Sequence, residues 1–193
     1  MADSGAIRDI GETLVDLVRG ATAGVVDPAN VRVVAPRDLE NFDGGAELAI
    51  TVFLYRVGIV SEMRNGTFRT LPDGSQRRPP LPLELGFMVT PWAKDASQAN
   101  YLAGVIVRTL YDAANLSSAQ LRGAGWNPQD SAQIVLESLP IADHFRVWDS
   151  ARVPYRTSLA YAVRVIGIDS TERFHAPRVV DVTAAIGGRG QQS

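Results

Sequence analysis

The chain has 193 residues, of which 46% are hydrophobic and 21% are charged, and its formal net charge is -2. This length and composition are typical of one globular domain that buries its core without disulfides or structural metals. The absence of cysteine excludes thiolate metal sites, iron–sulfur clusters and cysteine nucleophiles. Because nucleic-acid binding depends on clustered positive charge, we expect no nucleic-acid partner.

The start of the chain is unlike a secretory signal, because residues 1–5 are polar and acidic. No apolar run approaches the about 20 residues that span a bilayer. We therefore expect a protein that begins in the cytoplasm and has no membrane partner.

The first predicted element is an amphipathic helix over residues 4–19, with apolar residues at helical spacing and charged residues between them. Gly20 follows as its expected C-terminal stop. After a turn at Asp27 and Pro28, residues 31–34 are a short β-prone segment. A polar loop is expected from there to Gly45.

Two long segments predict strands that are covered on both faces. Residues 47–57 and 81–90 are rich in β-branched, aromatic and aliphatic residues on both alternations. Pro91 is expected to stop the second strand, since proline cannot donate a ladder hydrogen bond. Both segments therefore belong in the interior of a sheet.

Residues 60–80 lie between these strands and predict an extended arm or loop, with turns at Asn65-Gly66 and Asp73-Gly74. A solvated loop and an anion-binding patch are both open interpretations of its arginines. We favour an arm that contacts a partner, because guanidinium groups suit interfaces and long loops are commonly functional. The arginines of this arm are Arg64, Arg69, Arg77 and Arg78.

A second helix is expected from a cap at Asp95 or Ser97 to about residue 113. The sequence of residues 117–120 has the spacing of a capping box and predicts a short helical turn. Residues 132–139 then predict a strand.

Residues from 141 onward predict a short helix that ends before Pro154, with Ile141, Phe145 and Trp148 as its apolar stripe. The remaining predicted elements are a long strand over 159–168, an edge strand over 178–183 and a loose tail over 187–193.

These elements predict an α/β (α+β) fold: one two-layer domain over residues 1–186, with helices packed on a mixed β-sheet. Residues 187–193 are expected to be a flexible tail. Neither an internal repeat nor a second domain is indicated.

The residue types that carry chemistry form no recognisable site. The two histidines, His144 and His175, lie on different elements, and Asp143 with His144 is interpreted as an exposed polar pair. Ser158 is interpreted as a hydrogen-bonding residue at a strand edge. We therefore expect no metal, no cofactor and no enzymatic activity.

Two carboxylates and the three tryptophans also indicate no catalytic site. Asp169 and Glu172 are interpreted as a polar strand exit. Trp92 and Trp148 are predicted core or interface anchors, and Trp126 is expected to be the most exposed of the three tryptophans.

Several stretches of the chain, in order, resemble the cap or tube-terminator proteins of extracellular contractile injection systems. They are LYRV at 54–57, Arg64 with Asn65, PPLPLEL at 79–85, MVTPWA at 88–93, LPIAD at 139–143, Val147 with Trp148, PYRTSLAY at 154–161, and 163–166. The resemblance spans most of residues 5–172.

The resemblance implies a fold related to the tail-terminator proteins of contractile phages. It also implies a structural subunit that forms a homo-oligomeric, hexameric ring on the distal end of the inner tube and contacts the tube and sheath proteins. Such a subunit would assemble in the cytoplasm and then remain part of the particle. The candidate interface residues are Arg64, Asn65, Arg69, Arg77, Arg78, Pro79, Pro80, Leu81, Pro82, Trp92, Tyr155 and Arg156.

Two alternatives stay open. Another structural subunit of the same particle, such as a tube–sheath adaptor or a baseplate component, would have a similar composition. A small enzyme or sugar-binding module centred on Ser158, His144 or Trp126 is the alternative from a different class.

Overall fold

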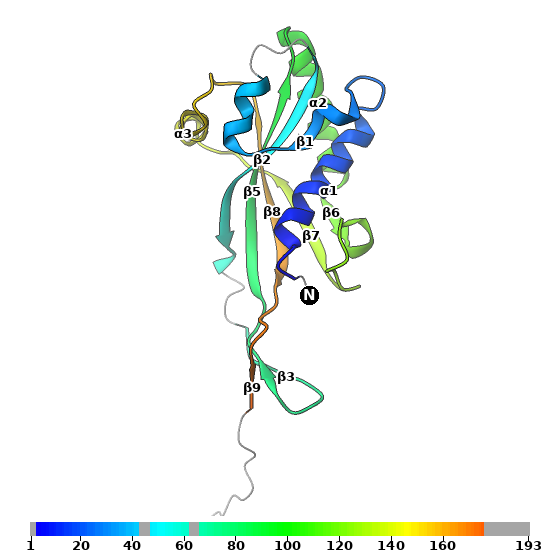
Figure 1. Ribbon diagram of the computed structural model, residues 1–193, viewed down its shortest axis with the longest axis vertical. Helices are drawn as coiled ribbons and strands as arrows, with labels where there is room; N and C mark the ends of the chain where they lie inside the picture. The colour runs from blue at the N-terminus through cyan, green and yellow to red at the C-terminus, as the bar shows by residue number, and fades with distance from the viewer. Residues whose placement is uncertain (1–2, 43–46, 62–65, 176–193) are drawn as a thin grey trace, which may run out of the picture.

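The structure is a computed structural model that describes residues 3–42, 47–61 and 66–175. Its main element is a six-stranded sheet with the strand order β1-β2-β5-β8-β7-β6 (Figure 1). The strand bounds are β1 Val31–Val33, β2 Ala49–Ile59, β5 Leu81–Trp92, β6 Asn115–Ser117, β7 Ser131–Leu136 and β8 Leu159–Ile168. Only the β1–β2 pair of this sheet is parallel, so the predicted mixed sheet is confirmed.

Helices α1 (Ala6–Ala21) and α2 (Ala96–Asp112) cover one face of this sheet. Both follow helical apolar spacing: α2 buries Leu102, Ile106 and Leu110, and the side chain of Asp95 caps its start. The apolar face of α1 packs with them on residues of β2, β5, β7 and β8. These contacts form the larger of the two hydrophobic clusters.

The opposite face is covered only in part, by α3 (Ile141–Ala151) and the 3₁₀ helix η2 (Pro36–Phe42). The Trp92 and Trp148 rings meet here with centroids 6.0 Å apart. Trp92 Nε1 donates a hydrogen bond to Thr51 Oγ1 at 2.9 Å, so the polar atom of the buried indole is satisfied. The α3 and η2 helices thus add a partial layer to the predicted helix-on-sheet arrangement.

A second, small sheet forms an arm that projects beyond one end of the main sheet (Figure 1). Its strands are β3 (Arg69–Thr70), β4 (Gln76–Arg77) and β9 (Arg173–Phe174), in the order β3-β4-β9. The predicted turn at Asp73 is confirmed, with Gly74 at a φ of 80° and Asp73 Oδ1 accepting the Ser75 N–H at 2.9 Å. Residues from two distant parts of the chain therefore build the arm.

Two predicted element ends are wrong. The first helix continues through Gly20 to Ala21, because Thr22 closes it with its N–H and its hydroxyl both donating to the Val18 carbonyl. Strand β5 continues through Pro91, which pairs with Ile50 of β2. Since β8 stops pairing with β5 at Val89, the missing N–H of Pro91 interrupts no ladder on that side.

The loop after β1 and the end of β7 differ slightly from the prediction, and two other short 3₁₀ helices are present. The predicted loop after β1 contains η2, and the strand predicted to reach residue 139 ends at Leu136. The capping-box turn is present as η4 (Ser118–Gln120), and the short 3₁₀ helix η1 (Pro28–Asn30) follows the Asp27 cap. The predicted 178–183 strand, the tail and the turn at Asn65 lie outside the described residues.

Candidate interaction surfaces

Ion pairs between residues far apart in the sequence join the arm to the body and hold the arm together. Arg77 Nη1 lies 3.3 Å from Asp169 Oδ2, and these two side chains are 22% and 20% exposed. Arg173 Nη1 lies 3.1 Å from Asp73 Oδ2 within the arm. Asp169 is therefore more than the polar strand exit that the sequence indicated, because it anchors the arm to the end of β8.

The more exposed side of the arm carries a second set of contacts. Arg78 lies 3.6 Å from Glu172 and places its guanidinium over the Phe174 ring, 5.3 Å from the centroid. The Phe68 and Phe174 rings meet edge to face with centroids 5.8 Å apart. Arginine and aromatic side chains on a projecting element are typical of protein interfaces.

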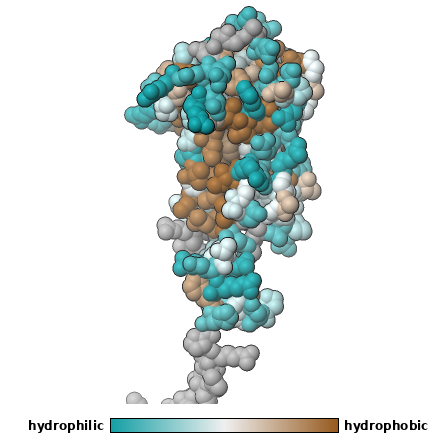
Figure 2. All heavy atoms as spheres, viewed as in Figure 1, coloured by the Kyte–Doolittle hydropathy of each residue, from teal (hydrophilic) through white to brown (hydrophobic). Residues whose placement is uncertain are grey.

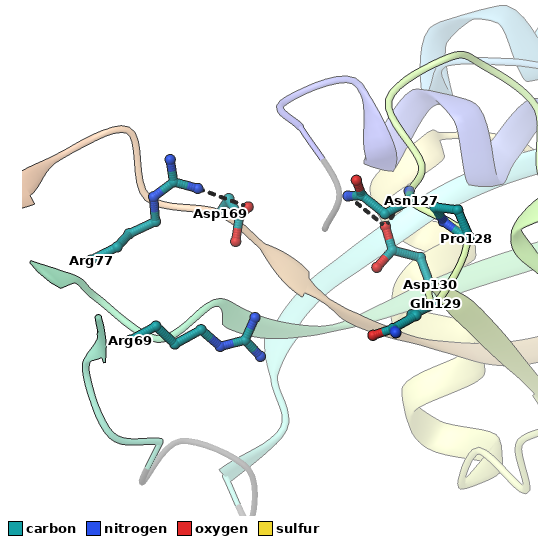
Figure 3. A pocket seen from close by; sticks show the side chains of 7 residues that line it. All are labelled: Arg69, Arg77, Asn127, Pro128, Gln129, Asp130 and Asp169. Atoms are coloured by element: carbon teal, nitrogen blue, oxygen red, sulfur yellow. Dashed lines mark hydrogen bonds and ion pairs between the residues drawn. The ribbon is translucent and has the colours of Figure 1, made fainter. Parts of the chain in front are cut away.

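A cavity of about 550 Å³ separates the arm from the loop at 127–130 (Figure 3). Figure 3 shows Arg77 and Asp169 pointing toward each other on one side of it, with Asn127 and Asp130 together on the other. The lining residues are Arg69, Arg77, Asn127, Pro128, Gln129, Asp130 and Asp169. Since charges of both signs line it, the cavity suits a polar segment better than a simple anion.

An apolar strip lies on the sheet face that α1 covers, beside the arm. Figure 2 shows this brown surface above the arm, and Val57, Ile59 and Leu81 are 51%, 46% and 45% exposed. Val57 lies opposite Leu85 and Ile59 opposite Leu83, so β2 carries the apolar face of the core out beyond the helices.

The reverse face of the same strands is charged. Arg56 Nη2 lies 3.0 Å from Glu84 Oε1 and 3.1 Å from Glu137 Oε1, and Arg164 Nε lies 2.9 Å from Glu84 Oε2. The Arg164 hydrogen bond, followed by the charge of Arg56, lowers the pKa of Glu84. Burial and a hydrogen bond to Glu137 raise the pKa of the Tyr55 hydroxyl to about 12. The positive charges of Arg56 and Arg164 balance the negative charges of Glu84 and Glu137, so these side chains form a self-compensating ion-pair network on the sheet.

The structure brings together His144 and Ser158, which the sequence analysis treated separately. His144 Nε2 lies 2.7 Å from Ser158 Oγ, and Trp148 Nε1 donates to the same oxygen at 3.0 Å. An indole N–H only donates, so Ser158 accepts from Trp148. When His144 is neutral with Nε2 unprotonated, the Ser158 hydroxyl can donate to it. Burial lowers the pKa of His144, which favours that neutral form.

This arrangement corrects the exposed position expected for His144, because its side chain is half-buried against Ser158. Asp143 is not an acid–base partner of His144 and pairs with Arg146 at 2.6 Å. Ser158 is only 8% exposed and holds Trp148, so it has the position of a structural anchor at the start of β8. The expected strand-edge role of Ser158 is confirmed.

The candidate interface residues fall into three groups. Arg64 and Asn65 lie outside the described residues. Trp92 and Pro82 are buried within the chain, so their side chains are not on its surface; Trp92 is only 2% exposed. The members at least partly at the surface are Arg69, Arg77, Arg78, Pro79, Pro80, Leu81, Tyr155 and Arg156.

Tyr155 and Arg156 lie apart from the arm, beside α3. Tyr155 is 42% exposed and packs on Phe145 with ring centroids 4.6 Å apart. Arg156 lies over the Trp92 ring, 5.5 Å from its centroid. Trp126 is half-buried, with Nε1 donating to the Arg122 carbonyl at 2.5 Å.

Val57 and Ile59 are surface residues that the predicted strand pattern did not indicate. Val57 lies in the segment 47–57, which is predicted to be a strand covered on both faces, and Ile59 lies just beyond that segment. Only the short length of β1 and the position of α1 reveal that this end of the strand is open. A possible signal was Gly58 between Val57 and Ile59, since glycine weakens a strand interior.

Within residues 3–42, 47–61 and 66–175, no group of histidine and carboxylate side chains has the arrangement of a metal site. In the same part of the chain, the helices are too short or too polar to cross a bilayer.

Solved structures that share this fold include two terminator or cap proteins. A comparison with curated protein sequences gave no match. The sheath/tube terminator of PVC, an extracellular contractile injection system, in its extended state has a TM-score of 0.64 at 18% identity, covering 97% of this chain and 65% of that one. The tube-terminating cap of the anti-feeding prophage has a TM-score of 0.62 at 18% identity, covering 93% and 61%. This chain thus spans less than two thirds of the length of either protein.

The profile of the Pvc16 N-terminal domain family matches residues 9–181. That range includes α1 from residue 9 onward, α2, the whole main sheet, the described strands of the arm and α3. The chain therefore belongs to the Pvc16 N-terminal domain family.

Proposed function

We propose that this chain is a cap or terminator subunit of a contractile injection system. In this role it forms a hexameric ring on the distal end of the inner tube, stops tube growth and anchors the sheath. The observation that carries the proposal is the family match over residues 9–181. The fold it shares with two proteins described as a sheath/tube terminator and a tube-terminating cap supports it.

The surfaces of the chain support a role in assembly. A ring needs heterologous contacts, in which one patch of a subunit meets a different patch of the next. The arm, with Arg69, Arg78 and Leu81, and the apolar strip at Val57 and Ile59 are two distinct candidate patches. We propose that they contact neighbouring subunits and the tube, while Tyr155 and Arg156 lie on a separate surface available to the sheath.

The proposed role needs no cofactor and no catalytic group. His144 and Ser158 hold Trp148 in place, and the Arg56 network pairs its charges internally. We propose that the subunit folds and assembles in the cytoplasm and then stays in the extracellular particle.

The position of the chain on the particle tests this proposal. Gold labelling of a short epitope tag, read by electron microscopy, should mark only the end distal to the baseplate. Label at the baseplate, or along the sheath, would contradict the proposal and favour an adaptor or baseplate subunit.

A further inference from the structure

One edge of the main sheet is open along half of strand β2. Strand β1 is short and pairs only with Ile50, Thr51 and Val52. In the part of the chain that the structure describes, residues 53–59 pair with β5 on one side and with no strand on the other. Figure 1 shows this half of β2 at the outer margin of the sheet, next to the arm.

A register shift between Leu54 and Arg56 divides this edge. Such a bulge protects an edge locally by bending the strand. Beyond it the pairing with β5 is regular from Arg56 to Ile59, opposite Gly86 to Leu83. We call residues 56–59 the open edge of β2.

The open edge has one apolar face and one polar face. Val57 and Ile59 point to the α1 side of the sheet and are 51% and 46% exposed. Arg56 points to the reverse side, where it pairs with Glu84 and Glu137. An exposed strand edge with β-branched apolar side chains is a template for pairing with another extended segment.

A segment that fits this edge has apolar residues at alternate positions with polar residues between them. Within residues 178–183 of this chain, residues 180–183 have that pattern: Val180 and Val182 alternate with Asp181 and Thr183, and Val179 precedes them. The sequence predicts a strand there, and the segment lies outside the described residues.

The position of Phe174 near the end of the described residues favours a second copy of the chain, and not the same chain, as the one whose β2 edge accepts this segment. Strand β9 ends at Phe174 on the arm, and the arm projects away from the main sheet past the end of β2 (Figure 1). Only a few residues separate Phe174 from residue 178, so the segment starts at the arm. Because the arm lies beyond the main sheet, we take the edge of a second copy as the acceptor.

We propose that residues 178–183 of one copy add as a strand to the open edge of β2 in a second copy, with Val180 and Val182 against Val57 and Ile59. The added strand would bond the free backbone groups of the edge and cover both exposed side chains. Because donor and acceptor are different patches, the contact is heterologous and can close a ring. The inference deepens the proposed function, on which it rests only for the presence of neighbouring copies.

Disulfide trapping tests the contact directly, because the chain has no cysteine of its own. A chain with Val57→Cys is mixed with a differently tagged chain that carries one cysteine at 180, 181, 182 or 183, and the mixture is oxidised. Cross-strand neighbours on one face lie close enough for a disulfide, whereas residues on opposite faces do not. We expect several-fold more covalent heterodimer from Val180→Cys and Val182→Cys than from Asp181→Cys and Thr183→Cys.

Equal yields at all four positions would overturn the proposal, as would yields no higher than those of a Tyr111→Cys control on the exposed side of α2. Ile59→Cys repeats the test with a second acceptor, and circular dichroism checks that each variant is folded. A double variant, Val57→Cys with Val182→Cys, that closes within one chain would also overturn it.

Failure of this contact is distinguishable from failure of the proposed function. The trapping experiment uses the purified chain, whereas the labelling experiment locates the chain on the particle. Label at the distal end without alternating crosslinks would leave the cap role standing and reject the strand contact.

Discussion

Arg77 and Asp169 form a largely buried ion pair that links the arm to the end of β8, with 3.3 Å between Nη1 and Oδ2. Their positions are 92 residues apart in the sequence. The pair fixes where the arm leaves the sheet, because β4 continues from Arg77 toward β5 and Asp169 directly follows β8. The ion pair therefore fixes the arm where β4 leads into β5 and where β8 ends.

Replacing Arg77 by methionine should loosen the arm, since Asp169 would lose the charge that compensates its burial. We expect the free energy of unfolding to fall by about 1 to 3 kcal/mol, less than for a fully buried pair. Amide hydrogen exchange should become faster in β4 and β9. The matched control is Arg78→Met, whose pair with Glu172 is exposed and should contribute less than about 1 kcal/mol. Equal losses from the two variants would contradict this assignment.

Ser158→Ala should destabilise the α3 side of the core. The change leaves the buried Trp148 N–H and His144 Nε2 without their shared partner, which costs about 1 to 3 kcal/mol in the free energy of unfolding. Urea unfolding measures the loss. The control is Ser150→Ala on the exposed side of α3, where the hydroxyl bonds only the Val147 carbonyl. A loss in the control as large as that in Ser158→Ala would contradict the anchoring role.

Stability should depend on pH through His144. Burial lowers the pKa of His144 in the folded chain below its ordinary value of 6.5, so near that pH the unfolded chain binds more protons. The contribution is present above about pH 6.5 and is lost as the pH falls toward the folded-state pKa. Urea midpoints from about pH 5 to 8 should fall toward acid in this window. The slope should flatten in His144→Gln, and an unchanged slope would contradict the prediction.

Replacing residues 64–78 by a short glycine–serine linker should abolish capping and leave the main sheet folded. The deletion removes β3 and β4 but none of the six strands of that sheet. Circular dichroism and thermal unfolding of the purified chain test folding, and electron microscopy of particles tests capping. Particles of normal length made with a folded deletion variant would contradict a role of the arm in assembly.

Local pattern predicted most of the regular structure. The β-branched, aromatic and aliphatic content of β2 and β5 and the helical spacing in α1 and α2 are properties of short segments, and they place these elements within a few residues of their bounds. The predicted ends of α1 at Gly20 and of β5 at Pro91 were wrong because contacts with other residues outweigh the preference of the glycine or the proline to end an element. Thr22 closes the helix past the glycine, and the end of the β8 pairing makes the proline harmless.

The surfaces were harder to predict than the strands. The ion pairs of the arm join positions that no local pattern connects, and β9 is too short to give a signal of its own. The exposure of Val57 depends on how far β1 extends beside β2, which is a property of the whole sheet. Trp92 illustrates the opposite case: its place in a motif indicated an interface, and its packing on Trp148 puts it in the core.

The length distribution of particles, assembled with and without this chain and measured by negative-stain electron microscopy, tests the cap role most directly. Particles that lack the chain should have tubes or sheaths of irregular length with open distal ends. Particles that keep their normal length and a closed distal end would contradict it.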